Sequence, residues 1–233
     1  MSTTTLFANI NLDDDSFMNK RKQGYLISFE GVDGAGKSSH IARVKTHLEQ
    51  LGYECLQTRE PGGTPVGESI RDLVLHHDMD INTELLLMYA ARRQHMVQTI
   101  QPALDRGVWV ITDRFEDSSF AYQAGAGGAS WEACQQLSKW ALNGFEPTLT
   151  FLFDLPIAVS QARIQGRAGD GDKFEAKPGN YFEAVRAGFI KRAQLNPRRI
   201  RVIDAQPSEA EVGEAVLLEL DKFMRTHLNL GLA

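Results

Sequence analysis

The sequence is poor in cysteine and has no long apolar segment. Its 233 residues include only Cys55 and Cys134, too few for a disulfide framework or a four-cysteine zinc site. The apolar run over 85–91 ends at two arginines, far short of the ~20 residues that cross a bilayer. We therefore expect a cytoplasmic protein, from a reducing compartment, with no membrane partner.

The sequence also lacks an excess of basic residues. It carries 25 Lys and Arg against 30 Asp and Glu, a formal net charge of −5. This balance argues against a protein that coats nucleic acid, and no nucleic-acid partner is expected. Hydrophobic residues make up 42% and Gly contributes 20 positions, a composition typical of globular domains.

The first 23 residues are polar and show neither helical nor strand periodicity. We predict a flexible N-terminal extension over 1–23, with a short docking helix over 12–18 as the alternative. No linker or internal repeat divides the remainder, so 24–233 is predicted to be one domain.

Five short runs rich in Val, Ile, Leu and Phe alternate with segments of helical spacing. Such runs indicate buried parallel strands, and the alternation favours an α/β fold, a five-stranded parallel sheet flanked by helices. The predicted strands span 25–29, 53–57, 108–112, 149–153 and 200–203.

Local signals predict where several helices begin and end. Asn82 or Thr83 is expected to cap a long helix that runs toward Arg106, with a kink or break at Pro102. An S-x-x-E capping box over 208–211 predicts the start of the last helix. The apolar face of the long helix is expected to include Leu85, Met88, Met96 and Ile100.

Polar motifs follow the first three predicted strands: FEGVDGAGKSS, TREPGGT and TDRFEDSSFAYQ. Ligands of such sheets bind beyond the carboxyl ends of the strands, so we expect the motifs to share one rim. The first motif fits the P-loop pattern, because it follows a strand and opens a helix. We expect ATP to be held by Gly31, Val32, Asp33, Gly34, Ala35, Gly36, Lys37, Ser38 and Ser39.

The P-loop pattern also predicts chemistry at individual residues. Lys37 neutralises the β and γ charge, and the Ser38 hydroxyl can ligate Mg²⁺. Asp113 is expected to hold the metal through water. A GTPase is disfavoured, since the only Asn-Lys pair lies in the polar tail. Arg114 directly after Asp113 suits an anionic acceptor rather than a water-directing ATPase site.

Three arginines from separate segments are candidates for binding an acceptor phosphate: Arg59, Arg92 and Arg114. The planar guanidinium donates two hydrogen bonds to a phosphate and stays charged. Each could instead be a surface charge. A phosphate acceptor is already ionised near neutral pH, so its phosphorylation needs no strong general base.

The third motif continues with Ser118, Tyr122 and Gln123 on a predicted helix. Gln123 offers a donor and an acceptor, which fits the edge of a pyrimidine base. The alternative is an ordinary capped helix with Tyr122 in the core. Further along, Arg163, Arg167 and Lys173 stand among glycines over 163–180, which indicates a mobile basic lid or a solvated loop of balanced charge.

Together these motifs resemble the bacterial thymidylate kinases, nucleoside monophosphate kinases that convert dTMP to dTDP. FEGVDGAGKSS, TREPGGTPVGE, YAARRQH and DRFEDSSFAYQ occur in family order and spacing. The resemblance implies the P-loop nucleoside monophosphate kinase fold, a lid that supplies the cations, and a homodimer. It also implies that Arg92 and Arg114 hold the dTMP phosphate, Asp33 the sugar 3′-hydroxyl and Gln123 the thymine, with Tyr122 excluding a ribose 2′-hydroxyl.

The sequence departs from the family pattern at three positions. Met88 stands where a Phe usually stacks on thymine, and its sulfur can still contact a ring. Gly127 replaces a common Arg, and Lys173 stands where the lid often has Arg. Lys173 keeps the charge but loses the two-pronged fork, so more of the catalysis is expected from Arg163 and Arg167.

The predicted function is the ATP-dependent phosphorylation of dTMP, with ATP and Mg²⁺ as cofactors. Two alternatives stay open at this point: a kinase of another pyrimidine monophosphate, and a P-loop ATPase that acts as a conformational switch.

Overall fold

The computed structural model describes residues 23–165, 177 and 179–228. Their centre is one sheet with the strand order β2-β3-β1-β4-β5, in which every neighbouring pair is parallel. This confirms the predicted five-stranded parallel sheet. The strands are β1 (Leu26–Glu30), β2 (Cys55–Arg59), β3 (Trp109–Asp113), β4 (Leu149–Asp154) and β5 (Ile200–Asp204).

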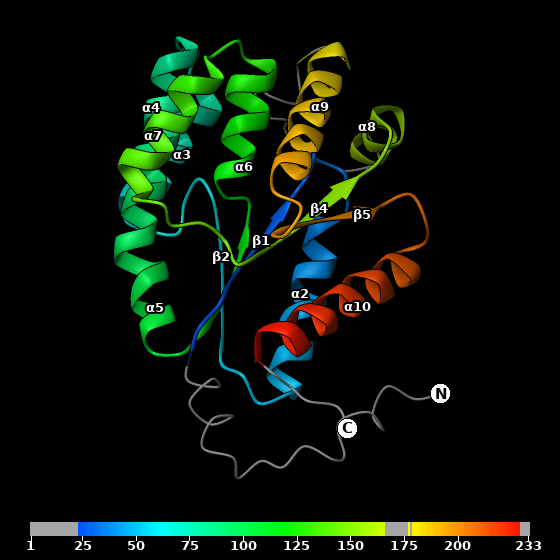
Figure 1. The fold of residues 1–233 in the computed structure, drawn as a ribbon. Helices are drawn as coiled ribbons and strands as arrows, with labels where there is room; N and C mark the ends of the chain where they lie inside the picture. Colours follow the sequence, from blue (N-terminus) through cyan, green and yellow to red (C-terminus); the bar gives the residue numbers. More distant parts are fainter. Residues whose placement is uncertain (1–22, 166–176, 178, 229–233) are drawn as a thin grey trace.

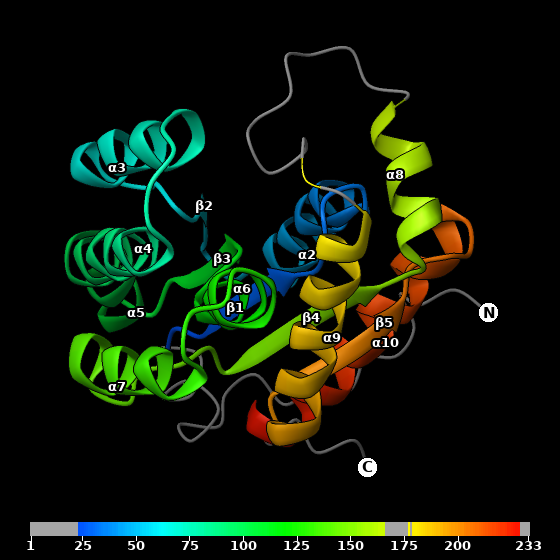
Figure 2. The ribbon, with the colours of Figure 1, turned by 90° about the horizontal axis from the view of Figure 1, so that it is seen from above.

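Helices cover both faces of this sheet (Figures 1 and 2). The helices α3, α4 and α7 stand together, while α2 packs against α10. The bounds are α2 (Lys37–Gln50), α3 (Pro65–His76), α4 (Ile81–His95), η2 (Met96–Ile100), α5 (Gln101–Asp105), α6 (Glu116–Ser119), η3 (Phe120–Ala126), α7 (Trp131–Leu142), α8 (Ile157–Gln165), α9 (Gly179–Leu195) and α10 (Glu209–Leu228).

The apolar runs predict buried strands, and this holds for the central strands but not for the edge strands. Every residue of β1 is buried, whereas β5 alternates between buried and more exposed positions and β2 has only partly buried and exposed residues. Successive side chains of a strand point to opposite faces. Tyr25 and Trp109 therefore pack against Phe223 of α10, while Leu26 and Val110 belong to a second core with α4 and α7.

The long helix after the second motif begins two residues earlier than predicted. Asp80, rather than Asn82 or Thr83, is its cap, because the Asp80 carboxylate accepts hydrogen bonds from the backbone N–H groups of both residues at 2.9 and 3.1 Å. The predicted disturbance at Pro102 takes the form of the π-helical turn η2 just before it. A wider turn accommodates the missing proline N–H.

The predicted apolar face of this helix is confirmed, since Leu85, Met88, Met96 and Ile100 are all buried. The capping box of the last helix is confirmed too. The Ser208 N–H donates to the Glu211 carboxylate at 3.0 Å, and the Glu211 N–H donates to Ser208 Oγ at 3.3 Å.

Two predicted segments fall largely outside the described residues: the N-terminal extension and the lid. The described ends of the lid are helical, because 163–165 close α8 and 179–180 open α9. Within the described ranges, no helix combines the length and apolar character that crossing a membrane requires.

Candidate active site

The loop between β1 and α2 has the backbone shape of a phosphate cradle. Gly31, Gly34 and Gly36 have φ angles of 136°, 78° and 88°, which glycine adopts at little cost. A Cβ on Gly34 would lie 2.6 Å from the Ser160 carbonyl oxygen. In the part of the chain that the structure describes, no side chain caps the first turn of α2, so its N–H groups are available to phosphate oxygens.

Lys37 lies folded over this loop. It is buried, and its Nζ donates to the carbonyl oxygens of Gly31 and Val32 at 3.2 and 3.3 Å. Burial, together with the nearby Arg114 guanidinium, lowers the pKa of Lys37. The ammonium group therefore sits where an incoming phosphate would be its strongest partner.

A hollow beside the loop has the donor atoms of a magnesium site. Ser38 and Asp113 line it together with Arg59 and Glu68. Asp113 Oδ1 is buried, and among the described residues it has no hydrogen-bond partner. A carboxylate oxygen and a hydroxyl are ligands that Mg²⁺ prefers, so the residues present fit this ion.

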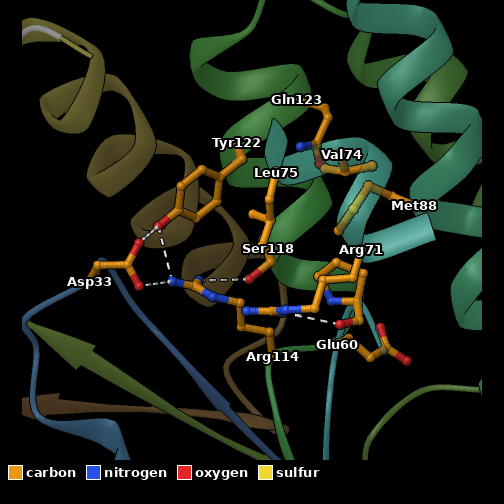
Figure 3. Close-up of a pocket in the computed structure, with 11 residues that line it drawn as sticks. Asp33, Glu60, Arg71, Val74, Leu75, Met88, Arg114, Ser118, Tyr122 and Gln123 are labelled. Carbon is orange, nitrogen blue, oxygen red and sulfur yellow. Dashed lines mark hydrogen bonds and ion pairs between the residues drawn. The ribbon is translucent and has the colours of Figure 1, made fainter. Parts of the chain in front are cut away.

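Arg114 connects the loop to a second cavity (Figure 3). Its φ of 69° is left-handed, and Thr112 Oγ1 supports this turn by donating to the Arg114 carbonyl oxygen at 2.9 Å. The guanidinium reaches back to the loop, donating to Gly31 O at 3.0 Å and to the Asp33 carboxylate at 2.7 Å. It also donates to Ser118 Oγ at 3.0 Å.

The charges in this cluster reinforce one another. Burial by itself would raise the pKa of Asp33, but Arg114 and Lys37 outweigh it and hold the pKa at about 2. Burial likewise opposes the charge on Arg114, and the neighbouring Tyr122, Asp33 and Asp113 raise its pKa nonetheless. Both groups are charged at neutral pH.

The second cavity is polar at the Arg114 end and mainly apolar at the other (Figure 3). Met88 and Gln123 lie at the far end, and Tyr122 stands between them and Asp33. The Tyr122 hydroxyl accepts from Arg114 at 3.1 Å. The lining residues are Asp33, Glu60, Pro61, Arg71, Val74, Leu75, Met88, Arg114, Ser118, Tyr122 and Gln123.

The chain is similar to thymidylate kinases in sequence and in fold. The family model described as thymidylate kinase matches residues 29–216. A thymidylate kinase of Methylobacillus flagellatus is 47% identical over 195 residues, covering 84% of this chain and 96% of the relative. One of Cupriavidus pinatubonensis is 47% identical, covering 88% and 99%. The chain belongs to the thymidylate kinase family.

A solved structure agrees with this assignment. The crystal structure of the thymidylate kinase from Ehrlichia chaffeensis superposes with a TM-score of 0.69 at 31% identity, covering 85% of this chain and 99% of that one. The resemblance read from the motifs and the predicted P-loop kinase fold are thereby confirmed.

Most predicted acceptor residues of this thymidylate kinase family member meet at the second cavity. Arg92 does not. It is 1% exposed, and its guanidinium donates to the Glu60 carboxylate at 2.6 Å, to Ser119 Oγ at 3.0 Å and to the Phe115 carbonyl oxygen at 3.0 Å. A buried acidic partner holds Arg92 outside the lining of the second cavity, and its contact with the dTMP phosphate stays a prediction.

Arg59 also lies away from the second cavity. Its guanidinium pairs with the exposed Glu68 carboxylate at 2.8 Å, and it lines the hollow of Ser38 and Asp113. Its contact with the acceptor phosphate stays a prediction.

Arg71, a residue of α3, also lines the second cavity and was not among the predicted site residues (Figure 3). Its Nη1 donates to the Pro61 carbonyl oxygen at 3.1 Å. Arg71 lies four residues after Gly67 and three before Val74, both buried. A cation at the helical spacing of buried residues was the available signal.

Gly127, one of the departures from the family pattern, has a local reason. A Cβ at this position would lie 2.4 Å from Ile81 Cδ1 and 2.8 Å from the Gln123 carbonyl oxygen. Because Ile81 of α4 and the backbone of η3 lie this close, a larger residue at position 127 would force one of them to move.

Of the predicted lid cations, Arg163 alone lies within the described residues. It is exposed, and its Nη2 donates to the Ala205 carbonyl oxygen at 3.0 Å. Arg163 lines a third hollow with Gly36 and His40, on the outer side of the phosphate loop. Arg167 and Lys173 lie outside the described residues.

Proposed function

We propose that this protein transfers the γ-phosphoryl group of ATP to the phosphate of dTMP, giving ADP and dTDP for dTTP synthesis. Membership of the thymidylate kinase family supports this reaction. The observation that carries it is the position of Arg114, which contacts the phosphate loop and lines the second cavity. One guanidinium thus spans the line along which a phosphoryl group would pass.

In this proposal the donor is bound at the loop and the acceptor in the second cavity. The dTMP phosphate attacks the γ-phosphorus of ATP, the bond to the β-γ bridging oxygen breaks, and ADP leaves. The acceptor oxygen is already ionised, so the protein aligns two anions and stabilises the charge on the transferred group. Lys37 and Arg114 supply positive charge, with Arg163, Arg167 and Lys173 as the proposed lid contribution.

The acceptor is oriented by the cavity walls. Arg71 and Arg114 are proposed to bind the dTMP phosphate and Ser118 to donate beside it. Asp33 is proposed to accept from the sugar 3′-hydroxyl. Tyr122 is proposed to exclude a ribose 2′-hydroxyl, while Gln123 and Met88 contact the thymine base.

Mg²⁺ is the proposed metal cofactor, held by the Ser38 hydroxyl and by Asp113 through water. The buried, unsatisfied Asp113 Oδ1 in the described part of the chain supports this placement. When bound, the ion would neutralise negative charge on the phosphate groups of ATP.

A homodimer is the proposed assembly. Large apolar side chains are exposed on α4, η2 and α7, namely Leu86, Val97 and Trp140, and contact with a second copy would remove such groups from water. Location in the cytoplasm stays a prediction that rests on the cysteine content.

The test is ADP release from ATP and Mg²⁺ with dTMP, dUMP, UMP or CMP as acceptor. We expect turnover with dTMP to exceed turnover with the others. Preference for another pyrimidine monophosphate would favour the related kinase, and ADP release that ignores every acceptor would favour the ATPase.

A further inference from the structure

We propose that Glu84 is a specificity-determining positioning residue, which orients the Gln123 carboxamide so that its oxygen faces the base. In that orientation the cavity accepts a pyrimidine with an N–H at position 3 and rejects cytosine. This inference rests on the proposed function, and it concerns a residue that does not itself line the cavity.

The two side chains form a buried pair between α4 and η3. Gln123 Nε2 donates to Glu84 Oε1 at 3.0 Å, and the residues are 2% and 5% exposed. A carboxylate only accepts hydrogen bonds. Glu84 therefore requires the amide nitrogen of Gln123 on its own side, whichever way the carboxamide would otherwise turn.

The other end of the carboxamide is left for a ligand. Gln123 Oε1 is buried, and within the described ranges it has no hydrogen-bond partner. Gln123 lines the cavity at the end away from Arg114, next to Met88 (Figure 3). A buried acceptor without a partner is costly, and a ligand N–H would satisfy it.

The base edges differ in the pattern that Gln123 meets. Thymine and uracil present an N–H at position 3 beside a carbonyl at position 4, which matches Gln123 Oε1 together with the second N–H of Nε2. Cytosine presents an acceptor at position 3 and an amino donor at position 4. Only a flipped carboxamide would match cytosine, and the flip would turn its oxygen toward the Glu84 carboxylate, where two acceptors face each other.

Glu84→Gln isolates this effect, because it keeps the size of the side chain while allowing it to donate as well as accept. Both orientations of Gln123 then become available. The experiment measures kcat/KM with dTMP, dUMP and dCMP for the wild type, Glu84→Gln, Glu84→Asp and Tyr89→Phe. Tyr89 is a buried residue of the same helix whose hydroxyl contacts Cys134 Sγ at 3.4 Å, so Tyr89→Phe controls for general loosening of α4.

We expect Glu84→Gln to lower the preference for dTMP over dCMP by about 10- to 100-fold, the cost range of one unsatisfied buried polar group. The ratio of dTMP to dUMP should stay unchanged, because both bases share the edge that Gln123 contacts. The KM for ATP should also stay unchanged. Glu84→Asp shortens the side chain by one methylene and withdraws the carboxylate from Gln123 Nε2, so the preference against dCMP should fall in this variant too.

An unchanged preference of dTMP over dCMP in Glu84→Gln would overturn the inference. So would an equal loss with all three acceptors that Tyr89→Phe reproduces. If Glu84→Gln fails to fold by circular dichroism, Glu84→Asp decides alone, and an unchanged preference against dCMP in that variant would overturn the role of the carboxylate. A wild type that ignores dTMP would instead refute the proposed function.

Discussion

The phosphate loop and the second cavity are built in different ways. The loop is one continuous segment. Its left-handed glycines, the buried Lys37 and the N-terminus of α2 all lie between Gly31 and Ser38, so they depend on the local sequence. The cavity is assembled from α3, α4, the end of β3 and η3. A local motif can be read residue by residue, whereas the walls of a cavity depend on which helices become neighbours.

Arg114 contacts the phosphate loop and lines the second cavity, and its place at the edge of the sheet could be predicted from the sequence. It directly follows β3, so the register of a central strand decides where it points. Arg92 and Arg71 lie on helices that pack outside the sheet, and there a rotation of the helix changes which side chain reaches the cavity.

Loss of Lys37 should have the largest effect, and it changes the phosphate loop without changing the second cavity. Lys37→Ala removes the charge that faces the transferred phosphoryl group, so we expect kcat to fall on the order of 10³-fold or more. Lys45→Ala is the matched control on the same helix, since Lys45 pairs with the exposed Glu49. Near-normal turnover of Lys37→Ala, with circular dichroism unchanged, would remove the loop from the mechanism.

Loss of Arg114 tests the link between the two regions. Arg114→Ala removes charge-assisted hydrogen bonds at the cavity, so the KM for dTMP should rise about 100-fold. The KM for ATP should change less. Arg106→Ala, a change at an exposed arginine, is the control in the same steady-state assay. Equal losses for both substrates would contradict the role at the acceptor phosphate.

A comparison of Arg71→Ala with Arg59→Ala sharpens the assignment of the acceptor phosphate. Arg71 lines the cavity and Arg59 does not, so the KM for dTMP should rise about 10-fold in Arg71→Ala and little in Arg59→Ala. Steady-state kinetics with dTMP as the varied substrate measure both values. The reverse order would restore Arg59 to the phosphate site and exclude Arg71.

The smallest effect is a pH dependence of stability at Glu30, the last residue of β1. Its carboxyl oxygens accept hydrogen bonds from the Phe115 N–H at 2.8 Å and from Ser118 Oγ at 2.6 Å, and these bonds connect β1 to the first turn of α6. Burial and the nearby Asp117 raise the pKa of Glu30 to about 8 from an ordinary value of 4.5.

The folded protein therefore holds a proton on Glu30 that the unfolded chain releases between pH 4.5 and 8. Stability from this group is present at low pH and is lost as pH rises through that window. Glu30→Gln cannot titrate, so its stability relative to the wild type should increase from pH 5 to pH 8 in urea unfolding. A constant difference across this range would contradict the shifted pKa.

The strands were predicted to within two residues, because an apolar run of strand length between turn signals has few other uses. The helix cap was wrong, since Asp80 and Asn82 are both good caps and only the path of the chain out of α3 selects between them. The surroundings of Arg92 could not be predicted, for a different reason. Its partner Glu60 lies 32 residues away in sequence, and no local pattern shows which arginine a buried carboxylate will hold.

Sequence by itself determined that polar motifs follow the strands, that the first of them forms the phosphate loop, and that an arginine comes directly after β3. These follow from short-range rules, namely glycine freedom, helix capping and the burial of apolar runs. Tertiary structure alone decided that Arg71 rather than Arg92 lines the cavity and that Glu84 meets Gln123. Those outcomes depend on how α3 packs against α4 and how α4 packs against η3, where many long-range contacts act together and no single residue sets the result.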